Sequence, residues 1–331
     1  MLKILLTGAA GFIGSNALEY FKKKDGYYVT AVIDKLTYAA DINNLRRLIA
    51  DDTTFYKHDI YAANWAHILH REDPDVVINF AAESHVDNAL LSYAADDFVR
   101  SNCHAVVRLV NALRKHNQEN RNVYFIQIST DEVLGDLPFD SKEEFDENQP
   151  LNPNNLYSAT KASAEFLVES LYRSHGDFNY TVVRATNNYG PYQHSEKFIP
   201  TIVRNAADNS PVPLYGSGKN VREWLWTGDF IYGLDLLVQK YFQDKNCVID
   251  HIFHFGSGER VSNLDMAELV LSLMEKPKSL VKMVQDRPGH DRRYALCSQK
   301  AQNILQWEPR MELETGLRTA ILDVLNRKRV Q

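Results

Sequence analysis

A glycine-rich turn near the amino terminus constrains the fold more than any other feature of this sequence. Lys3 to Thr7 is a short apolar run, and Phe12 to Lys24 repeats its apolar residues with helical spacing. Gly8, Gly11 and Gly14 mark the junction, so the order predicts a strand, a tight turn and a helix. Glycines let the backbone approach a pyrophosphate, which the positive end of a helix then stabilises. Glycines alone remain weak support, because such a turn can require them for conformational reasons only.

The same alternation of apolar runs and helical stretches continues along the chain. Further strands are predicted at Tyr28 to Ile33, Thr54 to Tyr56, Val76 to Phe80, Val123 to Ile128 and Tyr180 to Arg184. Helices are predicted at Ala62 to His70, Tyr93 to His116 and Ser158 to Ser174. Such alternation is typical of βαβ units. It predicts an α/β fold built on a doubly wound parallel sheet of the Rossmann type.

The texture changes after the last of these strands, which predicts a second, smaller mixed α/β domain for substrate. Loops rich in Asn, Gly and Pro are expected at Asn187 to Ser195, Asp208 to Pro213 and Gly216 to Asn220. A helix at Asp229 to Gln243 and a strand at Ile252 to Phe255 are expected to return to the first sheet. The predicted domains are therefore interleaved: a cofactor domain at residues 1–190 with a return around 225–256, and a substrate domain at 191–331.

Composition excludes several classes of protein. A net charge of -6 gives no concentrated basic surface for nucleic acid. The three cysteines lack C-x-x-C spacing and no H-E-x-x-H motif occurs, so neither disulfides nor a metal site is predicted. The opening apolar run ends at Thr7-Gly8, too short for a signal sequence, and no stretch reaches the ~18 to 20 apolar residues of a membrane span. We expect a cytoplasmic protein.

Asp34 ends the second predicted strand about twenty residues after the glycine turn. A carboxylate there accepts hydrogen bonds from an adenosine ribose and repels a 2′-phosphate. The sequence therefore predicts NAD rather than NADP as the cofactor. Lys35 follows directly and is expected to soften this preference.

A candidate catalytic group follows the predicted strand Val123 to Ile128. Ser129-Thr130 stands at its carboxyl end, where open α/β sheets place their ligands. Tyr157 and Lys161 lie four residues apart in a predicted helix and therefore share a face. A nearby ammonium lowers the pKa of a tyrosine, which is otherwise a poor base. Taken singly, Y-x-x-x-K is usually a solvated helix face, and its order after the other motifs gives it weight.

With these motifs the chain resembles the extended short-chain dehydrogenase/reductase family, and within it the dTDP-glucose 4,6-dehydratases. The most specific stretch is Ser129 to Val133, in which Asp131 and Glu132 directly follow Thr130. Other matching stretches are Asp34 to Tyr38, Ala81 to Asp87, Asn187 to Tyr192, Glu196-Lys197 and Asp286 to Tyr294. The resemblance runs from the amino terminus to about Leu325.

The resemblance implies a reaction on a nucleoside-diphosphate hexose. C4 of the sugar is oxidised with NAD, water is eliminated across C5 and C6, and the hydride returns to C6. Tyr157 takes the proton of the C4 hydroxyl, which Thr130 also hydrogen-bonds. Glu132 takes the C5 proton, and Asp131 protonates the departing C6 hydroxyl. Asp131 must then carry a proton, which requires a pKa raised by burial or by its acidic neighbour.

The resemblance also assigns binding residues. The cofactor contacts, in which the three glycines of the turn are included, are Gly8, Gly11, Phe12, Ile13, Gly14, Asp34, Lys35, Leu36, Thr37, Asp59, Ile60, Ala81, Ala82, Ser101, Tyr157, Lys161 and Asn188. The substrate contacts are Ser84, Thr130, Asn187, Lys197, Phe198, Pro213, Leu214, Tyr215, Arg222, Asn263, Arg287 and His290. Lys197, Arg222 and Arg287 suit a pyrophosphate, and Tyr215 suits a pyrimidine. The family also implies a homodimer, paired through Tyr93 to His116 and Ser158 to Ser174.

Several positions depart from the family's pattern. Leu134, Asn88 and Leu156 replace a tyrosine, an arginine and a proline, and Gly228-Asp229-Phe230 replaces acid-Asp-His. Leu134 and Asn88 are close enough in sequence to the site to alter the choice of substrate.

Related activities therefore stay open. One is dehydration of a UDP-sugar. The others are a 4-epimerisation and a decarboxylation, and the acid pair Asp131-Glu132 disfavours both of these. A non-catalytic nucleotide-sugar-binding protein is the other alternative, but Tyr157, Lys161, Asp131 and Glu132 are all present. The choice between thymine and uracil, and the downstream pathway, are not determined by the sequence.

Overall fold

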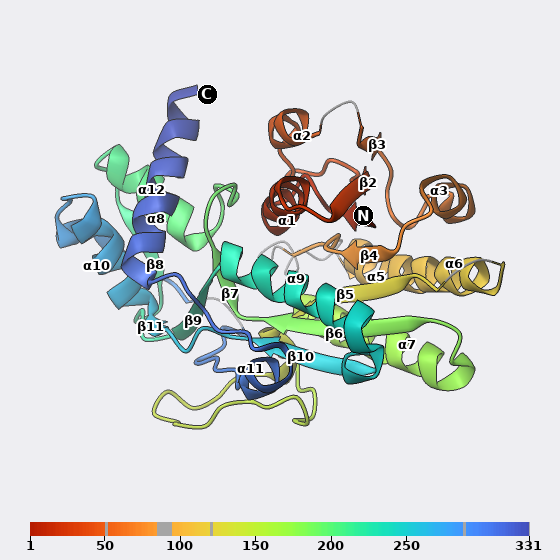
Figure 1. Cartoon of the computed structure of the whole chain (residues 1–331). Helices are drawn as coiled ribbons and strands as arrows, with labels where there is room; N and C mark the ends of the chain where they lie inside the picture. Colours follow the sequence, from red (N-terminus) through yellow and green to blue (C-terminus); the bar gives the residue numbers. More distant parts are fainter. Residues whose placement is uncertain (50–51, 85–94, 120–121, 287–288, 331) are drawn as a thin grey trace.

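Seven parallel strands form the central sheet of the protein (Figure 1). The computed structural model describes residues 1–331 except 50–51, 85–94, 120–121, 287–288 and 331. The strands follow the order β10-β6-β5-β4-β1-β2-β3, and each neighbouring pair is parallel. Their bounds are β1 (Leu2–Thr7), β2 (Tyr27–Ile33), β3 (Thr54–Tyr56), β4 (Val76–Asn79), β5 (Tyr124–Thr130), β6 (Asn179–Ala185) and β10 (His251–Phe255).

Helices cover both faces of this sheet, because its strands are apolar on both sides. Ile4 and Leu6 of β1 pack into one core cluster, and Leu5 between them packs into another. The first cluster includes residues of α1 (Phe12–Lys23), α2 (Ile42–Leu48), α9 (Thr227–Asp244) and α11 (Gln299–Leu305). The second includes residues of α3 (Trp65–Glu72), α6 (Ala105–Glu119) and α7 (Leu156–His175). The predicted doubly wound parallel sheet is confirmed, and its order reverses between β1 and β4, where such folds bind ligands.

The single helix predicted at Tyr93 to His116 was wrong in detail. Its first two residues lie outside the described residues. The structure then has α5 (Ala95–Val99), a π-helical turn η1 (Arg100–His104) and α6. In η1 the consecutive residues Ser101, Asn102 and Cys103 are all buried. A regular α-helix would turn one of three such residues outward, so the wider turn serves contacts that helical periodicity does not reveal.

A second group of elements consists of two small sheets and three helices. One sheet has the order β11-β9-β7, and the other pairs β12 with β8. The elements are β7 (Asn187–Tyr189), α8 (Phe198–Ala207), β8 (Val212–Tyr215), β9 (Val221–Trp226), β11 (Arg260–Ser262), α10 (Asn263–Leu273), β12 (Val281–Val284) and α12 (Leu313–Val330). Short helical turns complete the chain at η2 (Asp131–Leu134), η3 (Lys245–Cys247) and η4 (Lys278–Leu280). This agrees with the predicted smaller mixed sheet region.

Two loops predicted in this region contain strands. Asn187 to Ser195 includes β7, and Asp208 to Pro213 runs into β8. Each short strand pairs with a partner distant in sequence, β7 with Trp224–Trp226 and β8 with Val281–Val284. Local composition carries no information on such pairing, which is why the loops were predicted instead.

The chain returns to the central sheet after β9, since β10 pairs with β6 at the sheet edge. The domain boundary near residue 190 stays a prediction. Among the described helices, none is both long and apolar enough to cross a membrane.

Candidate active site

The glycine turn is shaped so closely that side chains would not fit. Gly8 has φ +67°, and a Cβ added to Gly14 would lie 2.2 Å from the carbonyl oxygen of Gly8. Gly11 caps α1 without any side-chain hydrogen bond, so no capping side chain covers the first amides of the helix. The turn therefore offers a helix amino terminus to an anion.

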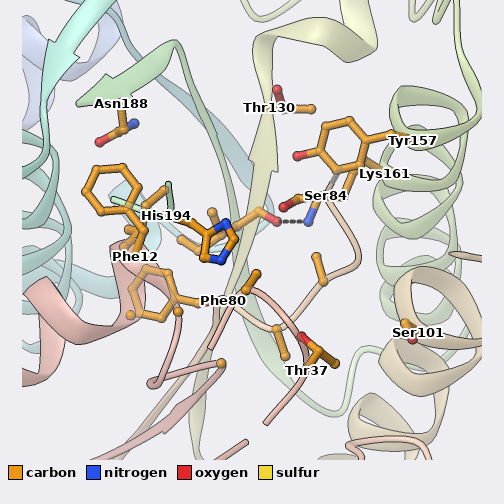
Figure 2. A pocket seen from close by; sticks show the side chains of 18 of the residues that line it. Phe12, Thr37, Phe80, Ser84, Ser101, Thr130, Tyr157, Lys161, Asn188 and His194 are labelled. Carbon is orange, nitrogen blue, oxygen red and sulfur yellow. Dashed lines mark hydrogen bonds between the residues drawn. The ribbon is translucent and has the colours of Figure 1, made fainter. Parts of the chain in front are cut away.

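A cavity of about 320 Å³ opens beside this turn at the carboxyl ends of the central strands. It brings together most of the residues predicted to bind cofactor or substrate. Those lining it are Gly8, Gly11, Phe12, Ile13, Gly14, Asp34, Lys35, Thr37, Asp59, Ile60, Ala81, Ala82, Ser84, Ser101, Thr130, Asp131, Glu132, Tyr157, Lys161, Asn187, Asn188 and Lys197. Figure 2 shows Tyr157, Lys161 and Thr130 on one side of the cavity, with Phe12 and Asn188 across from them.

Asp34 is held at the cavity by main-chain amides. Its carboxylate accepts hydrogen bonds from Ala10 N at 2.9 Å and Leu36 N at 2.8 Å. Burial raises the pKa of Asp34, and these two amides act in the opposite direction. Leu36 does not line the cavity. It has φ 59° and packs against the central core, so only its amide serves the site.

Tyr157 and Lys161 project from the first turns of α7, whose start is fixed by a capping box at Asn155. The ammonium of Lys161 donates a hydrogen bond to the carbonyl oxygen of Ile128 at 2.5 Å (Figure 2). Burial lowers the pKa of Lys161 to about 8, while Glu165 acts to raise it. Lys161 is therefore largely a cation at neutral pH.

The pKa expected for Tyr157 was wrong in direction. Burial raises it first, and the neighbouring carboxyl groups of Glu132 and Asp131 raise it further. Only a hydrogen bond with Thr130 acts to lower it, and Lys161 is not among the groups that shift it. The described residues therefore hold the phenol protonated.

The acid pair begins η2, directly after β5. Asp131 is buried, accepts a hydrogen bond from Thr130 Oγ1 at 3.1 Å, and has no partner for Oδ2 among the described residues. Burial, and then the charge of Glu132, raise its pKa well above the ordinary value. Glu132 accepts a hydrogen bond from Asn155 Nδ2 at 3.2 Å. Asp131 thus has the proton-retaining environment that a general acid needs.

Further polar groups face the cavity from the loop around β7. The oxygens Thr186 Oγ1, Asn187 Oδ1, Asn188 Oδ1 and Gln193 Oε1 are buried, and the described residues provide them with no hydrogen-bond partner. Buried polar atoms are normally satisfied, so these oxygens point to a polar ligand. Thr186 and Gln193 were missed in the sequence, although they flank the Asn187 to Tyr192 motif and could have been included with it.

Other lining residues were also missed. These are Ala39, Ala40, His58, Phe80, Ile128, Ala185 and His194, whereas Ser129 lines the cavity beside Thr130 as expected. Most of them are neighbours in sequence of predicted residues.

The other predicted substrate residues that the structure describes do not line this cavity. Tyr215 ends β8, is half-exposed, and meets His290 edge to face. The main-chain amide of Asn263 donates a hydrogen bond to the main-chain carbonyl oxygen of Asn220. Arg222 is buried and donates to the carbonyl oxygens of Val221 and Asp291, each at 2.9 Å.

The other members of that set are placed differently. Phe198 stacks on Trp224, and the side chain of Leu214 packs against Gly218. Pro213 is an exposed residue of β8. Arg287 lies outside the described residues. Of the two described basic residues assigned to a pyrophosphate, Lys197 lines the cavity and Arg222 does not.

The departures from the family's pattern can also be placed. Leu134 is buried in a small cluster with Val133, Ala162 and Leu296, and it does not line the cavity. Asn88 lies outside the described residues. The buried Asp229 accepts hydrogen bonds from the amides of Arg310 and Met311, which is a structural role.

Residues 5–320 match the protein family described as GDP-mannose 4,6 dehydratase. The chain belongs to this family. It is 38% identical over 327 residues to dTDP-glucose 4,6-dehydratase of Streptomyces antibioticus, covering 97% of this chain and 91% of that protein. It is also 38% identical over 322 residues to the low-salt glycan biosynthesis protein Agl12 of Haloferax volcanii, covering 97% of both.

Solved structures agree with this assignment. The dTDP-glucose 4,6-dehydratase of Bacillus anthracis in complex with NAD superimposes with a TM-score of 0.87 at 32% identity, covering 99% of this chain and 98% of that one. DesIV of Streptomyces venezuelae, with NAD and TYD bound, gives 0.88 at 32% identity with the same coverage. The predicted resemblance and the enzyme class, a nucleotide-sugar 4,6-dehydratase family of lyases, are confirmed.

Proposed function

We propose that this protein binds NAD and catalyses the 4,6-dehydration of dTDP-glucose to dTDP-4-keto-6-deoxyglucose. The observation that carries the proposal is the acid pair Asp131-Glu132, which lines the same cavity as Tyr157 and Lys161. An epimerase needs no group to expel the C6 hydroxyl. Relatives named as dTDP-glucose 4,6-dehydratases support the choice of substrate.

The residues present fit NAD. Gly14 leaves a cradle that a Cβ would fill, and the start of α1 suits its pyrophosphate. Asp34 supplies a carboxylate for the adenosine ribose, and Lys161 a cation for the second ribose. When bound, NAD supplies the hydride acceptor and the hydride donor of the reaction.

The chain's own residues then move the protons. Tyr157 would take the proton of the C4 hydroxyl as a phenolate. Because burial and the neighbouring acids hold the phenol protonated without ligands, that phenolate would form only once the positively charged nicotinamide of NAD is bound. The resulting ketone acidifies C5, so a carboxylate, Glu132, suffices as base. Asp131 donates its proton to the C6 hydroxyl, which leaves as water. C6 would then receive the hydride, and Glu132 would return a proton to C5.

The direct test is to incubate the purified protein with NAD and either dTDP-glucose or UDP-glucose, and to analyse the products by NMR. We expect the 4-keto-6-deoxy sugar from dTDP-glucose, and a lower rate with the uridine nucleotide. Inversion at C4 without loss of water would replace the dehydratase by a 4-epimerase. A faster reaction with UDP-glucose would show that the preferred substrate carries uracil instead of thymine.

We also propose a homodimer formed through α5, α6 and α7. Val99 and Phe166 on these helices are 36% and 57% exposed, unusual for large apolar side chains. Light scattering should give twice the mass of one chain, and Phe166→Asp should reduce it to one. Leu322→Asp on α12, where Leu322 is 60% exposed, is the matched control and should leave the dimer intact.

A further inference from the structure

Lys35, the residue after Asp34, is not a free cation. Its ammonium lies 2.8 Å from Glu83 Oε1, and it donates a hydrogen bond to Ser101 Oγ at 3.2 Å. Both charged side chains are largely withdrawn from solvent, with 29% of Lys35 and 16% of Glu83 exposed. The ion pair therefore joins the segment after β2 to the segment after β4, at the edge of the cavity.

Glu83 is itself fixed in place. Its amide donates to Asn102 Oδ1 at 2.9 Å, and its carbonyl accepts from Asn102 Nδ2 at 3.0 Å. The same Nδ2 donates to Thr160 Oγ1, next to Lys161 in α7. The π-helical turn η1 supplies both Ser101 and Asn102. The partner of Lys35 is thus set by three segments and does not depend on a bound molecule.

This arrangement bears on the two forms of the nicotinamide cofactor. Asp34 attracts a ribose hydroxyl and repels a 2′-phosphate, whereas a cation beside it attracts that phosphate. Asp34, Lys35 and Ser101 line the cavity, and Glu83 does not. Glu83 therefore contacts no ligand in the cavity itself, and its link to one is the ion pair with Lys35.

We propose that Glu83 is a cofactor-specificity residue, which withholds the Lys35 ammonium from a 2′-phosphate and so strengthens the preference for NAD over NADP. This inference rests on the proposed NAD site. Asp34 repels the 2′-phosphate of NADP, and Glu83 neutralises the Lys35 ammonium that would attract it. The softening of specificity that Lys35 suggests from sequence alone is removed by a residue nearly fifty positions away.

The test compares binding of NADH and NADPH by fluorescence titration, which needs no turnover. Glu83→Gln keeps the shape of the side chain and leaves the charge of Lys35 uncompensated. We expect the Kd for NADPH to fall about tenfold, as one charge-assisted hydrogen bond provides, and the Kd for NADH to stay within about twofold. Adding Lys35→Met to Glu83→Gln should abolish the gain.

Glu314→Gln is the matched control. It removes the same charge from an exposed ion pair with Arg318 on α12, so neither Kd should change. Lys35→Met alone gives a second measurement that does not depend on the folding of Glu83→Gln. Because Glu83 already neutralises Lys35, and an unpaired carboxylate does not attract a 2′-phosphate, this variant should bind NADPH no more tightly than wild type.

Three results would overturn the inference. They are an unchanged NADPH affinity in Glu83→Gln, an equal change for both nucleotides, and tighter NADPH binding in Lys35→Met. Each of these presupposes that wild type binds NADH. Failure of wild type to bind NADH at all would instead overturn the proposed function, and this inference with it.

Discussion

Asp131 holds a proton in the folded protein at pH values where an exposed aspartate has lost it. Burial and then Glu132 raise its pKa above the ordinary 3.8. The unfolded chain releases this proton at lower pH. The resulting loss of stability is therefore absent below about pH 3.8 and grows as pH rises toward the folded pKa.

Asp131→Asn removes this penalty together with the general acid. We expect the free energy of unfolding to rise at pH 7, because the variant no longer has to hold or lose a buried proton there. Product formation should fall by roughly 10²- to 10⁴-fold. Urea unfolding at pH 7 and pH 4 checks the first expectation, because the gain should shrink at pH 4. Equal destabilisation at both values would contradict it.

Tyr157→Phe tests the base while preserving the packing of the ring. The variant cannot take the C4 hydroxyl proton, so C4 oxidation should fall by at least about 10²-fold. Lys161 remains to hold the ribose, and the Kd for NADH should stay within about twofold. Stopped-flow absorbance at the NADH band and fluorescence titration measure the two quantities. Turnover close to wild type would assign the base to another residue.

At the scale of elements, α7 organises the site through three residues spaced four apart, Tyr157, Lys161 and Glu165. The buried Glu165 pairs with the buried Arg184 of β6 at 2.7 Å and also accepts a hydrogen bond from Ser129. Arg184 in turn contacts His254 Nε2 at 3.2 Å. Burial, then the charge of Arg184, lower the pKa of His254 to about 3, so the ring is neutral and accepts this hydrogen bond.

Glu165→Gln leaves the Arg184 guanidinium buried without its counter-charge. The free energy of unfolding should fall by about 3 to 5 kcal/mol. Glu169→Gln, one turn further along α7, breaks an exposed pair with Arg173 and should change it by no more than about 0.5 kcal/mol. Urea denaturation compares the two variants. Equal losses would show that the buried pair contributes no more than the exposed one.

The sequence predicted the elements whose signal is local. The central strands are buried apolar runs, and the glycine turn, Asp34 and the acid pair all follow such strands directly. The π-helical turn was not predictable, because Asn102 faces inward to bind Glu83, almost twenty residues earlier. The sequence also could not show that the Leu134 side chain packs into a small apolar cluster and not into the cavity, because that packing involves Leu296, far along the chain.

At the scale of the whole molecule, one cavity brings together the residues expected to bind the cofactor and the residues expected to react with the sugar. The glycine turn and Asp34 belong to the amino-terminal strands, the acid pair follows β5, and Asn187 and Asn188 come from β7. A nucleotide and a sugar bound there would share a single cavity. A hydride removed from the sugar is therefore expected to return to the same sugar molecule before either ligand leaves.

Isotope labelling tests this internal cycle. Substrate deuterated at C4 should give product with deuterium at C6, and NADH should not accumulate in proportion to product. In a mixture with undeuterated ¹³C-labelled substrate, no product should carry both ¹³C and the transferred deuterium. In D₂O one solvent deuterium should enter C5, and Glu132→Gln should lose that exchange while C4 oxidation persists. Deuterium scrambled between the two substrates would show that the hydride is released between the steps. Inversion of C4 with neither deuterium at C5 nor loss of water would assign the cavity to an epimerase, because Asp131 and Glu132 would then have no proton to move.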